Sequence, residues 1–490
     1  MYRGRPLYYA VFHCLFPLPP KATAVAFSAS SPIGTHAPTR DASVTPVRFE
    51  TARRVVPRGL AGRFLRVVEG RSRGFWARGP RWAAHAGVLG EIQVAPGPER
   101  FRAVGEAAEG WRLMGDGDEA LRFYGGFSFR DDHRPKERWD AFPAALFHLP
   151  AVELDGEGDG PARLRVRVPL LGDAAGAAQR LAEAEADTLL EVLNAPPSPS
   201  GVAPSPVKTT LRAGDRGTWL AVVERTLQEI RQGRLSKAVL ARTLDVDLAG
   251  RLDTVDVLLA LWRQHSDTHA FLFEPRPGSW LMGAAPEALA TLRDGRVTAT
   301  AVAGSVRRGS HPEEDRALAR SLLDSRKDRA EHRVVVEDMV ARLEPLTRGV
   351  LAEAEPHVLT LARIQHLETL IEAEAAEEHP ILALVEALHP TPAVCGMERD
   401  AARAFLDEAE PFHRGWYAGP VGWFDSEGEG HFVPALRTGV GTGDRWRLFA
   451  GAGIVEGSDP ESEWEETAIK FVPVLRALAA SGAEIEGVVP

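Results

Sequence analysis

The sequence predicts an α+β fold in which large antiparallel β-sheets pack as a layered sandwich with helices on the outside. Short strand-like runs occur in pairs joined by tight turns, and helical patterns are grouped between these pairs. The clearest pair, residues 288–292 and 296–301, surrounds Asp294-Gly295, a dipeptide typical of hairpin turns. Antiparallel pairs need no helix between their strands, so the grouped helices are expected to face the sheets.

The part of the chain before residue 208 is expected to contribute strands and one long helix. Residues 1–45 carry an apolar stretch that prolines and His13 interrupt, which predicts a disordered extension or an over-long start rather than a secretory signal. Residues 46–194 form the N-terminal part of the fold, and residues 195–207, APPSPSGVAPSPV, form a Pro/Ser-rich loop. The expected strands are 121–129, 144–152 and 162–168, and the expected helix is 174–193.

Residues 208–480 form the second and larger region. Its helices are predicted by apolar residues at helical spacing, as with Trp219, Val223 and Leu227, and its strands by alternating apolar and polar residues. The expected helices are 215–233, 252–265, 312–324, 328–343 and 462–479. The expected strands, besides the hairpin pair, are 235–246, 270–274, 279–284, 431–440 and 446–450.

Charge and cysteine usage disfavour several classes of function. The formal net charge of −10 argues against a nucleic acid held in a basic groove. Cys14 and Cys395 are the only cysteines, so they provide neither a disulfide framework nor a metal-binding cluster, and a reducing, cytoplasmic location is expected. No segment approaches the roughly 18–20 uninterrupted apolar residues of a membrane span.

Lysine is rare in this chain, with six lysines among 58 basic residues. Lys237 nevertheless lies in the apolar run LSKAVLAR. Arginine is effectively always protonated, whereas a lysine in an apolar site can lose its proton, so Lys237 is a candidate base. The alternative is a lysine at a strand end whose ammonium group reaches solvent.

Two pairs of carboxylates have the spacing of a single helix face. Asp328 and Glu331 are three residues apart on one expected helix, and Glu463 and Glu466 are three apart on another. Two such helices could meet around Mg²⁺, which binds one or two protein carboxylates and keeps positions for an anionic substrate. The alternative is that both faces are solvated, with Glu466 paired to Lys470 one turn later.

Other segments carry residues suited to bind or protonate an anion. A glycine-rich turn precedes Ser458 and leads into a helix with Pro460 near its first position, and a helix N-terminus favours a carboxylate. Arg437 is suited to clamp a carboxylate through two parallel hydrogen bonds. Glu287 follows an apolar strand, where burial would raise its pKa and let it donate a proton near neutral pH. In each case the alternative is a core strand with one polar residue facing solvent.

In order along the chain, eight segments resemble those of the chorismate-utilising enzymes, a family that includes isochorismate, salicylate, anthranilate and aminodeoxychorismate synthases. The segments are RLSKAVLAR, GAAPEALATL, AVAGSVRRG, DSRKDRAEH, HPTPAVCG, RGWYAGPVGWFDSEGEGHF, ALRTG and LFAGAGIVEGSDPESEWEETAIK. The resemblance is strong over residues 201–479 and weak over 50–194. It implies the chorismate-binding enzyme fold, with residues 208–480 as the catalytic region.

The resemblance implies a magnesium enzyme that acts on chorismate. Glu331 and Glu466 would bind Mg²⁺, while Asp328 and Glu463 would act one helical turn away through water. The residues implied to contact chorismate are Gly304, Ser305, His389, Tyr417, Arg437, Gly453 and Lys470. Arg437, Tyr417 and Lys470 would hold the pyruvyl carboxylate with backbone N–H groups at Gly453, and His389 would lie near the ring.

Within the family, the resemblance implies an isochorismate synthase that works as a monomer. Lys237 would take a proton from the water that attacks C2 of chorismate, and Glu287 would protonate the departing C4 hydroxyl. A lysine at the position of Lys237 is typical of members that use water and not of those that use ammonia, which disfavours anthranilate synthase. The menaquinone and siderophore pathways are not separated by these residues.

Three further functions stay open at this point. A salicylate synthase shares the first half-reaction and then eliminates pyruvate, and the named residues do not separate it from an isochorismate synthase. A non-catalytic chorismate-binding protein would not need both Lys237 and Glu287. A nucleotide-binding loop is disfavoured because no Gly-Lys-Ser/Thr follows the glycine-rich turn.

Overall fold

The computed structural model describes residues 48–58, 60–112, 120–170, 175–196, 206–376 and 379–486. The expected N-terminal extension, residues 1–45, and most of the expected loop 195–207 lie outside the described residues. Among the described helices, none combines the length and the apolar composition needed to cross a membrane.

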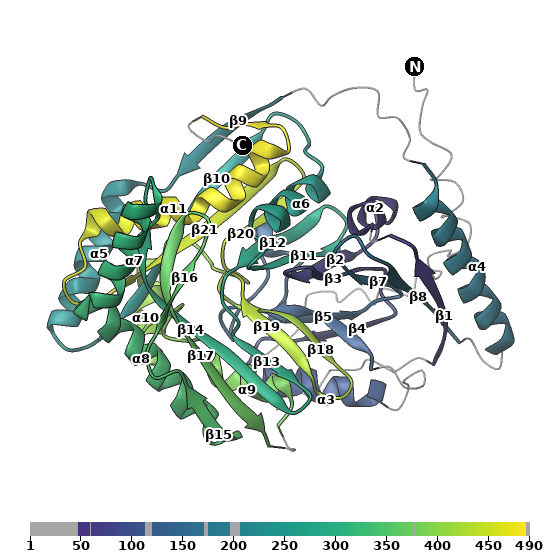
Figure 1. Ribbon diagram of the computed structural model, residues 1–490, viewed down its shortest axis with the longest axis horizontal. Helices are drawn as coiled ribbons and strands as arrows, with labels where there is room; N and C mark the ends of the chain where they lie inside the picture. Colours follow the sequence, from purple (N-terminus) through teal and green to yellow (C-terminus); the bar gives the residue numbers. More distant parts are fainter. Residues whose placement is uncertain are drawn as a thin grey trace, which may run out of the picture. The chain divides into compact units, whose positions relative to one another are not determined.

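Two large antiparallel sheets dominate the described part of the chain (Figure 1). The larger sheet contains, from edge to edge, β1 (Phe49–Val56), β8 (Ala162–Pro169), β7 (Val152–Glu157), β3 (Arg81–Ala86), β2 (Arg73–Arg78), β11 (His269–Arg276), β12 (Ser279–Ala285), β20 (Thr438–Thr442), β21 (Arg445–Ile454), β10 (Ala238–Leu248), β9 (Val207–Ala213) and β22 (Ala483–Glu484). Its neighbouring strands are antiparallel except β22 and β9, which are parallel. The larger sheet therefore joins strands from both regions of the sequence.

The smaller sheet also combines the two regions. It contains β15 (Thr347–Ala352), β17 (Ile364–Ala375), β14 (Arg296–Arg307), β13 (Ala290–Arg293), β19 (Gly430–Pro434), β18 (Pro420–Asp425), β5 (Arg122–Phe127), β6 (Ala145–Leu149) and β4 (Gly90–Val94), with β16 (His357–Thr360) paired to β17. Hairpin β13–β14 turns at Asp294 and Gly295, whose φ angles of 50° and 71° are those a tight two-residue turn requires. The predicted hairpin is confirmed.

Helices cover the outer faces of both sheets. They are α2 (Ala61–Val67), α3 (Arg100–Arg112), α4 (Ala175–Asn194), α5 (Arg216–Arg231), α6 (Thr254–Gln264), α7 (Pro312–Asp324), α8 (Arg326–Leu343), α9 (Ile381–Leu388), α10 (Arg399–Ala409) and α11 (Pro460–Ala480), with a short 3₁₀ helix at Glu137–Trp139. Figure 1 shows α4 alongside β1 and β8, and α11 lies on β21 next to α5 and α6. This arrangement confirms the expected α+β fold with helices outside the sheets.

Two apolar cores hold these layers together. Between the sheets, Trp76 and Phe273 of the larger sheet belong to one cluster with Tyr124 and Leu146 of the smaller sheet. On its other face, the smaller sheet packs against helices through a second cluster that includes Phe127 and residues of α3, α8 and α9. Successive strand residues point to opposite faces, so the smaller sheet is buried on both sides.

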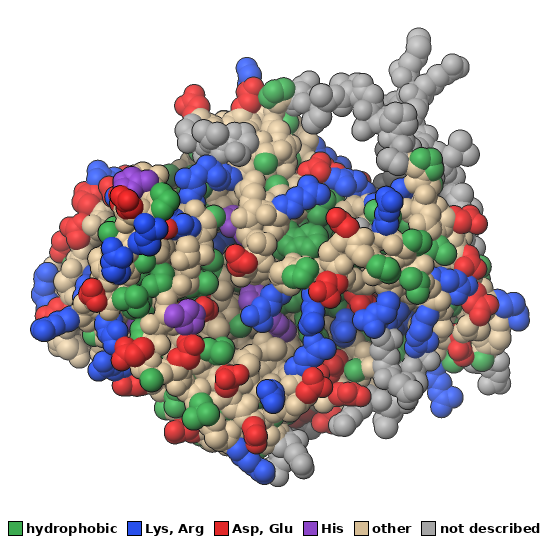
Figure 2. Space-filling model, viewed as in Figure 1, with side chains coloured by type: hydrophobic (Ala, Val, Ile, Leu, Met, Phe, Trp, Pro, Cys, Tyr) green, Lys and Arg blue, Asp and Glu red, His purple; other side chains and the backbone are tan. Residues whose placement is uncertain are grey.

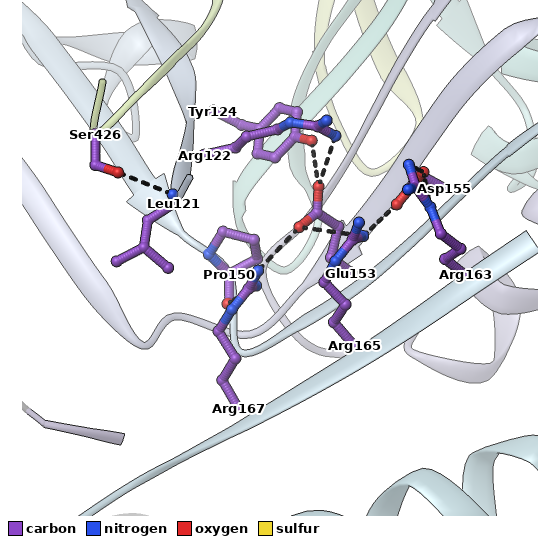
Figure 3. A network of polar contacts seen from close by, with 10 residues as sticks. All are labelled: Leu121, Arg122, Tyr124, Pro150, Glu153, Asp155, Arg163, Arg165, Arg167 and Ser426. Atoms are coloured by element: carbon purple, nitrogen blue, oxygen red, sulfur yellow. Dashed lines mark hydrogen bonds and ion pairs between the residues drawn. The ribbon is translucent and has the colours of Figure 1, made fainter. Parts of the chain in front are cut away.

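A buried ionic network also joins the two sheets (Figure 3). Glu153 of β7 is 2% exposed and accepts a hydrogen bond from the Tyr124 hydroxyl of β5 at 2.6 Å. Arg167 of β8 lies 3.2 Å from the same carboxylate and Arg122 of β5 lies 3.4 Å from it. Because two of these partners belong to the other sheet, the network connects the layers through directed polar contacts.

The ends of several helices follow from local capping groups. The Asp215 side chain accepts a hydrogen bond from the Thr218 N–H at the start of α5. Ser325 caps α8 in the same way, and Asp459 caps α11, which begins with Pro460. The structure therefore starts α8 and α11 two residues before the ranges predicted from apolar spacing alone.

One predicted strand is wrong. The expected strand 431–440 is two strands, because β19 ends in the smaller sheet and β20 begins in the larger one. The chain crosses between the sheets at residues 435–437, and Arg437 has a φ of 50°, which a continuous strand does not allow. The alternating apolar pattern spans both pieces, so it does not reveal the crossing.

Charged side chains of both signs are distributed over the surface. On the face drawn in Figure 2, acidic and basic side chains are interspersed rather than gathered into one patch of a single sign. Mixed charge of this kind is typical of the surfaces of globular proteins.

Candidate active site

A pocket opens between the two sheets where β10 and β21 of the larger sheet meet β14 and β17 of the smaller one. It encloses about 750 Å³ of empty space, part of which is open to solvent. Helices α8 and α11 and the loop after α9 also contribute to its walls. The predicted site residues that line it are Lys237, Glu287, Gly304, Ser305, Glu331, Tyr417, Arg437, Gly453, Glu466 and Lys470.

Lys237 immediately precedes β10 and is buried against α8. It is 3% exposed, and its Nζ donates a hydrogen bond to Oε1 of Glu331 at 2.7 Å. A Cβ atom at Gly453 of β21 would lie 2.9 Å from that oxygen and 3.1 Å from Cε of Lys237. Glycine at position 453 therefore leaves the room in which these two side chains meet.

Glu287 follows β12 and lies in the same pocket. Burial raises the pKa of its carboxyl group to about 8, and the charge of Glu368 acts in the same direction. Lys470, Arg437 and Lys237 oppose this shift without cancelling it. The carboxyl group is therefore mostly protonated at neutral pH and can donate a proton.

Arg437 provides buried positive charge in the pocket. Its side chain is 9% exposed, and burial lowers the pKa of its guanidinium to about 10. The guanidinium Nη2 lies 3.2 Å from Nε2 of His366, a residue of β17. Since its hydrogen-bond partner is an imidazole rather than a carboxylate, the positive charge of Arg437 can attract an anionic ligand.

The two carboxylates predicted to bind Mg²⁺ face the pocket from different helices. Glu331 comes from α8, and Glu466 comes from α11, where its Oε1 accepts a hydrogen bond from Nζ of Lys470 at 2.6 Å. Lys470 also donates to the carbonyl oxygen of Gly451 at 2.8 Å. Each of the two carboxylates is thus held by a lysine of the same pocket.

The other two acidic residues lie behind this pair. Burial and the charge of Glu466 raise the pKa of Glu463 to about 7. Asp328 packs against Gly304, where a Cβ atom would lie 3.1 Å from its own Cβ. Within the described residues, no group of three or more Asp, Glu, His or Cys side chains forms a closed metal cage. Two carboxylates with an acidic neighbour fit Mg²⁺, which needs only one or two protein ligands.

The family of this chain is shown by a match over most of its length. A family model described as chorismate binding enzyme matches residues 65–479. The chain belongs to the chorismate-binding enzymes. The match extends well into the N-terminal part, where the sequence resemblance is weak.

Two curated relatives of this chorismate-binding enzyme are isochorismate synthases. The salicylate biosynthesis isochorismate synthase of Pseudomonas aeruginosa is 38% identical over 392 residues, which cover 79% of this chain and 80% of that protein. The isochorismate synthase MenF of Bacillus subtilis is 34% identical over 360 residues, which cover 72% of this chain and 74% of that protein. The resemblance inferred from the eight segments is confirmed.

A solved structure has the same fold. The menaquinone-specific isochorismate synthase MenF from Escherichia coli superposes with a TM-score of 0.72 at 27% identity. The superposition covers 89% of this chain and 95% of that protein. The α+β architecture of this chorismate-binding enzyme is therefore that of the isochorismate synthases.

The pocket of this chorismate-binding enzyme also contains a phenol. Tyr417 is buried with its ring stacked on Phe449, at 4.9 Å between ring centroids. Burial raises the pKa of its hydroxyl group to about 12, so the group stays protonated and can donate a hydrogen bond. A Cβ atom at Gly451 would lie 3.0 Å from this hydroxyl oxygen. The glycine leaves the hydroxyl accessible from β21.

His389 does not line the pocket, contrary to the expectation that it lies near the ring of the substrate. Its Nε2 lies 2.9 Å from the carbonyl oxygen of Phe129, and its ring packs among Phe101 and Phe129. Burial lowers the pKa of its imidazole to about 3. Ala393 and Val394 of the same HPTPAVCG segment line the pocket instead.

The sequence motifs missed one pocket residue, His366. Burial, with the nearby charges of Arg437 and Lys470, lowers the pKa of His366 well below its usual value. The neutral imidazole accepts a hydrogen bond from Arg437 through Nε2, so its proton is on Nδ1, which lies 2.9 Å from Oγ of Ser305. His366 therefore links Arg437 to the Gly304-Ser305 turn. A histidine in an alternating strand is the sole sequence signal, and it is equally typical of a strand without a site.

Proposed function

We propose that this protein is an isochorismate synthase that converts chorismate to isochorismate with Mg²⁺ as its cofactor. The observation that carries the proposal is that a buried lysine, Lys237, and a protonated carboxyl group, Glu287, line one pocket. A base and an acid are what the reaction requires, since water must be deprotonated and a hydroxyl group must leave.

Chorismate carries two carboxylates, and the pocket has cationic side chains, Arg437 and Lys470, for one of them. Arg437 and Lys470 are proposed to hold the pyruvyl carboxylate, with a hydrogen bond from Tyr417 and backbone N–H groups at Gly453. His366 supports this assignment because, as a neutral acceptor, it orients the guanidinium without neutralising it. The ring carboxylate is proposed to face the Mg²⁺ that Glu331 and Glu466 would hold.

Glu331 and Glu466 are the residues proposed to hold Mg²⁺, with Asp328 and Glu463 acting through water. When bound, the metal would offset the charge of the ring carboxylate and of the two glutamates. Glu463 supports the assignment, because burial and, to a smaller extent, the nearby charge of Glu466 raise its pKa, and a bound cation would offset both effects. The oxygen donors are those that Mg²⁺ prefers.

In the proposed reaction, Lys237 is the general base, and it accepts a proton once its ammonium group has released one. Its lone pair accepts a proton from the water that attacks C2, while an N–H group continues to donate to Glu331. The ring double bond shifts, the C4–O bond breaks, and Glu287 gives its proton to the departing hydroxyl group. One water is added and one water is released, so chorismate and isochorismate are isomers.

The alternative reaction continues from isochorismate to salicylate by elimination of pyruvate. The relative from Pseudomonas aeruginosa is named for salicylate biosynthesis but is itself an isochorismate synthase. We therefore propose that this chain also stops at isochorismate. We further propose that it acts as a monomer in the cytoplasm, the latter supported by the single buried free cysteine of the described residues, Cys395.

A product assay tests the proposal. The purified chain is incubated with chorismate and Mg²⁺, and the products are separated by chromatography, with the Lys237→Ala protein as a matched control. Isochorismate is expected from the wild type, and only traces of it from Lys237→Ala over the same time. Because the reaction is expected to be reversible, the wild type should reach the same mixture of chorismate and isochorismate from either compound. Salicylate with pyruvate, anthranilate in the presence of ammonia, or no conversion would each overturn the proposal.

A further inference from the structure

The start of β10, next to Lys237, has no strand on one of its edges. On one side β10 pairs with β21 from Ala238 to Asp247. On the other side it pairs with β9 only from Leu244 to Leu248. The backbone groups of residues 239–241 on that second edge therefore need other partners, because a buried backbone donor or acceptor without a hydrogen bond is costly.

A buried ion pair, Arg414 and Glu410, supplies partners on this edge. Nη2 of Arg414 donates to the carbonyl oxygen of Val239 at 2.6 Å. Oε1 of Glu410 accepts from the N–H of Ala241 at 2.8 Å. The N–H of Val239 donates to the carbonyl oxygen of Cys395 at 2.9 Å, and the N–H of Met397 donates to the carbonyl oxygen of Lys237 at 3.0 Å. Two side chains and one loop thus take the place of a missing strand.

The same arginine binds the loop that forms the neighbouring wall of the pocket. Nη1 of Arg414 donates to the carbonyl oxygen of Val394 at 2.8 Å. Val239 and Val394 both line the pocket, although they are far apart in the sequence. The Tyr417 N–H donates to the carbonyl oxygen of Arg414 at 2.9 Å, and Tyr417 is a third lining residue.

Arg414 is held firmly in this position. Its Nε lies 2.8 Å and its Nη2 lies 2.5 Å from the two carboxylate oxygens of Glu410, a bidentate pair. The guanidinium is 4.5 Å from the ring centre of Phe129, and Arg414 is 4% exposed. A lysine at this position could not reproduce the planar set of donors.

We infer that Arg414 is a positioning residue for this active site, which it serves by fixing the start of β10, and with it Lys237, against the loop that carries Val394. The inference rests on the proposed function, because its test measures the rate at which chorismate is converted to isochorismate. Lys237 is two residues from Val239, so a small shift of this edge moves the proposed base relative to the substrate. Misplacement of a reacting group by about 1 Å can reduce the rate about 10²-fold.

Arg414→Lys tests the inference by separating kcat from KM. The contacts proposed to bind the substrate, above all those of Arg437, are not made by Arg414, so KM should change less than threefold. The kcat should fall about 10- to 100-fold at a temperature well below the Tm of the variant. Wild-type kcat in the folded Arg414→Lys protein would overturn the inference, since a purely structural role lowers Tm alone.

Arg73→Lys is the matched control. Arg73 is also a buried arginine whose Nε donates to a buried glutamate, Glu274, at 2.6 Å, and which donates to the backbone carbonyl oxygen of Leu65 at 2.6 Å. None of these residues lines the pocket. Arg73→Lys should therefore lower the Tm but leave kcat within twofold of the wild type. Equal loss of kcat in both variants would show a general effect of stability and overturn the inference.

Further variants test the same inference if Arg414→Lys does not fold. Glu410→Gln keeps an oxygen for the Ala241 N–H but loses the ion pair, and its kcat should fall about threefold to tenfold. When Arg414→Lys or Glu410→Gln is added to Lys237→Ala, the remaining kcat of Lys237→Ala should fall less than threefold. A full loss in that background would show that Arg414 does not act through Lys237. Isochorismate formation by the wild type, measured first, tests the proposed function separately.

Discussion

Nζ of Lys237 lies 2.7 Å from Oε1 of Glu331, although the two residues are 94 positions apart in the sequence. The contact brings the proposed base against one of the two carboxylates proposed to bind Mg²⁺. Lys470 and Glu466 form an equivalent contact at 2.6 Å on the opposite helix. The pocket therefore holds the proposed base and the two carboxylates proposed to bind Mg²⁺ in two lysine–glutamate pairs.

Lys237→Arg is expected to remove most of the activity. Arginine keeps the positive charge beside Glu331 but cannot release a proton near neutral pH. The kcat should fall by about 10²–10⁴-fold, the usual contribution of one positioned base. Steady-state kinetics measure it, with Lys208→Arg on the exposed strand β9 as a neutral control. Activity within tenfold of the wild type would show that Lys237 supplies charge alone.

The pH dependence should report Glu287. The carboxyl group must be protonated to act as the acid, and burial raises its pKa to about 8. The protonated fraction falls as pH rises through that value, so kcat/KM should decline above about pH 8. Glu287→Gln should lose about 10²–10⁴-fold in kcat, because an amide cannot donate the required proton. If the decline of kcat/KM at high pH is unchanged in Glu287→Gln, a group other than Glu287 causes that decline.

Removal of the metal should abolish turnover. EDTA should stop the reaction and added Mg²⁺ should restore it, because without the metal the ring carboxylate of chorismate would face the carboxylates of Glu331 and Glu466. Glu466→Gln should raise the Mg²⁺ concentration needed for half-maximal activity by at least about tenfold. Glu461→Gln, on the exposed side of the same helix, is the control. Full activity in metal-free buffer would contradict the proposed cofactor.

Arg437→Lys should weaken chorismate binding. Lysine keeps the charge but loses the planar pair of donors, which corresponds to roughly 1.5–3 kcal/mol for charge-assisted hydrogen bonds. His366→Ala should act in the same direction by about 0.5–1.5 kcal/mol, since it removes the acceptor that orients Arg437. A double-mutant cycle on chorismate affinity should give less than the sum of the two. Strict additivity would show that His366 does not act through Arg437.

The network of Figure 3 should matter for stability rather than for catalysis. Glu153→Gln removes the anion that the buried Arg167 side chain contacts at 3.2 Å, which should cost about 3–5 kcal/mol of the free energy of unfolding. Urea denaturation measures this loss of stability. The control is Asp187→Asn, which removes the exposed ion-pair partner of Arg54 and should cost less than about 1 kcal/mol. A loss for Glu153→Gln no larger than that control would contradict the expectation.

The stability that Glu153 contributes should depend on pH. Burial alone would raise the pKa of Glu153, but Arg167, Arg122 and Arg165 lower it well below its usual range. The stabilisation is therefore complete above the pKa of the unfolded chain and is lost as pH falls toward the lower pKa of the folded protein. The difference in stability between the wild type and Glu153→Gln should narrow below about pH 4.

By itself, the sequence determined the features that depend on neighbouring residues. The Asp294-Gly295 turn and the two carboxylate pairs could be predicted because turn geometry and helical spacing act over a few residues. The helices near Ser325 and Asp459 could be predicted in type, although their first turns needed the capping hydrogen bonds. Lys237 stood out because lysine is rare in the chain and this one lies in an apolar run.

Only the tertiary structure decided which of these residues meet. The crossing at Arg437, the place of His389 beside Phe129 and the contact of His366 with Arg437 depend on segments that are distant in the sequence. Apolar alternation has the same period in both sheets, so it cannot show where the chain changes sheet. Arg414 shows the same limit, because the edge of β10 that it completes exists only once the strands have paired.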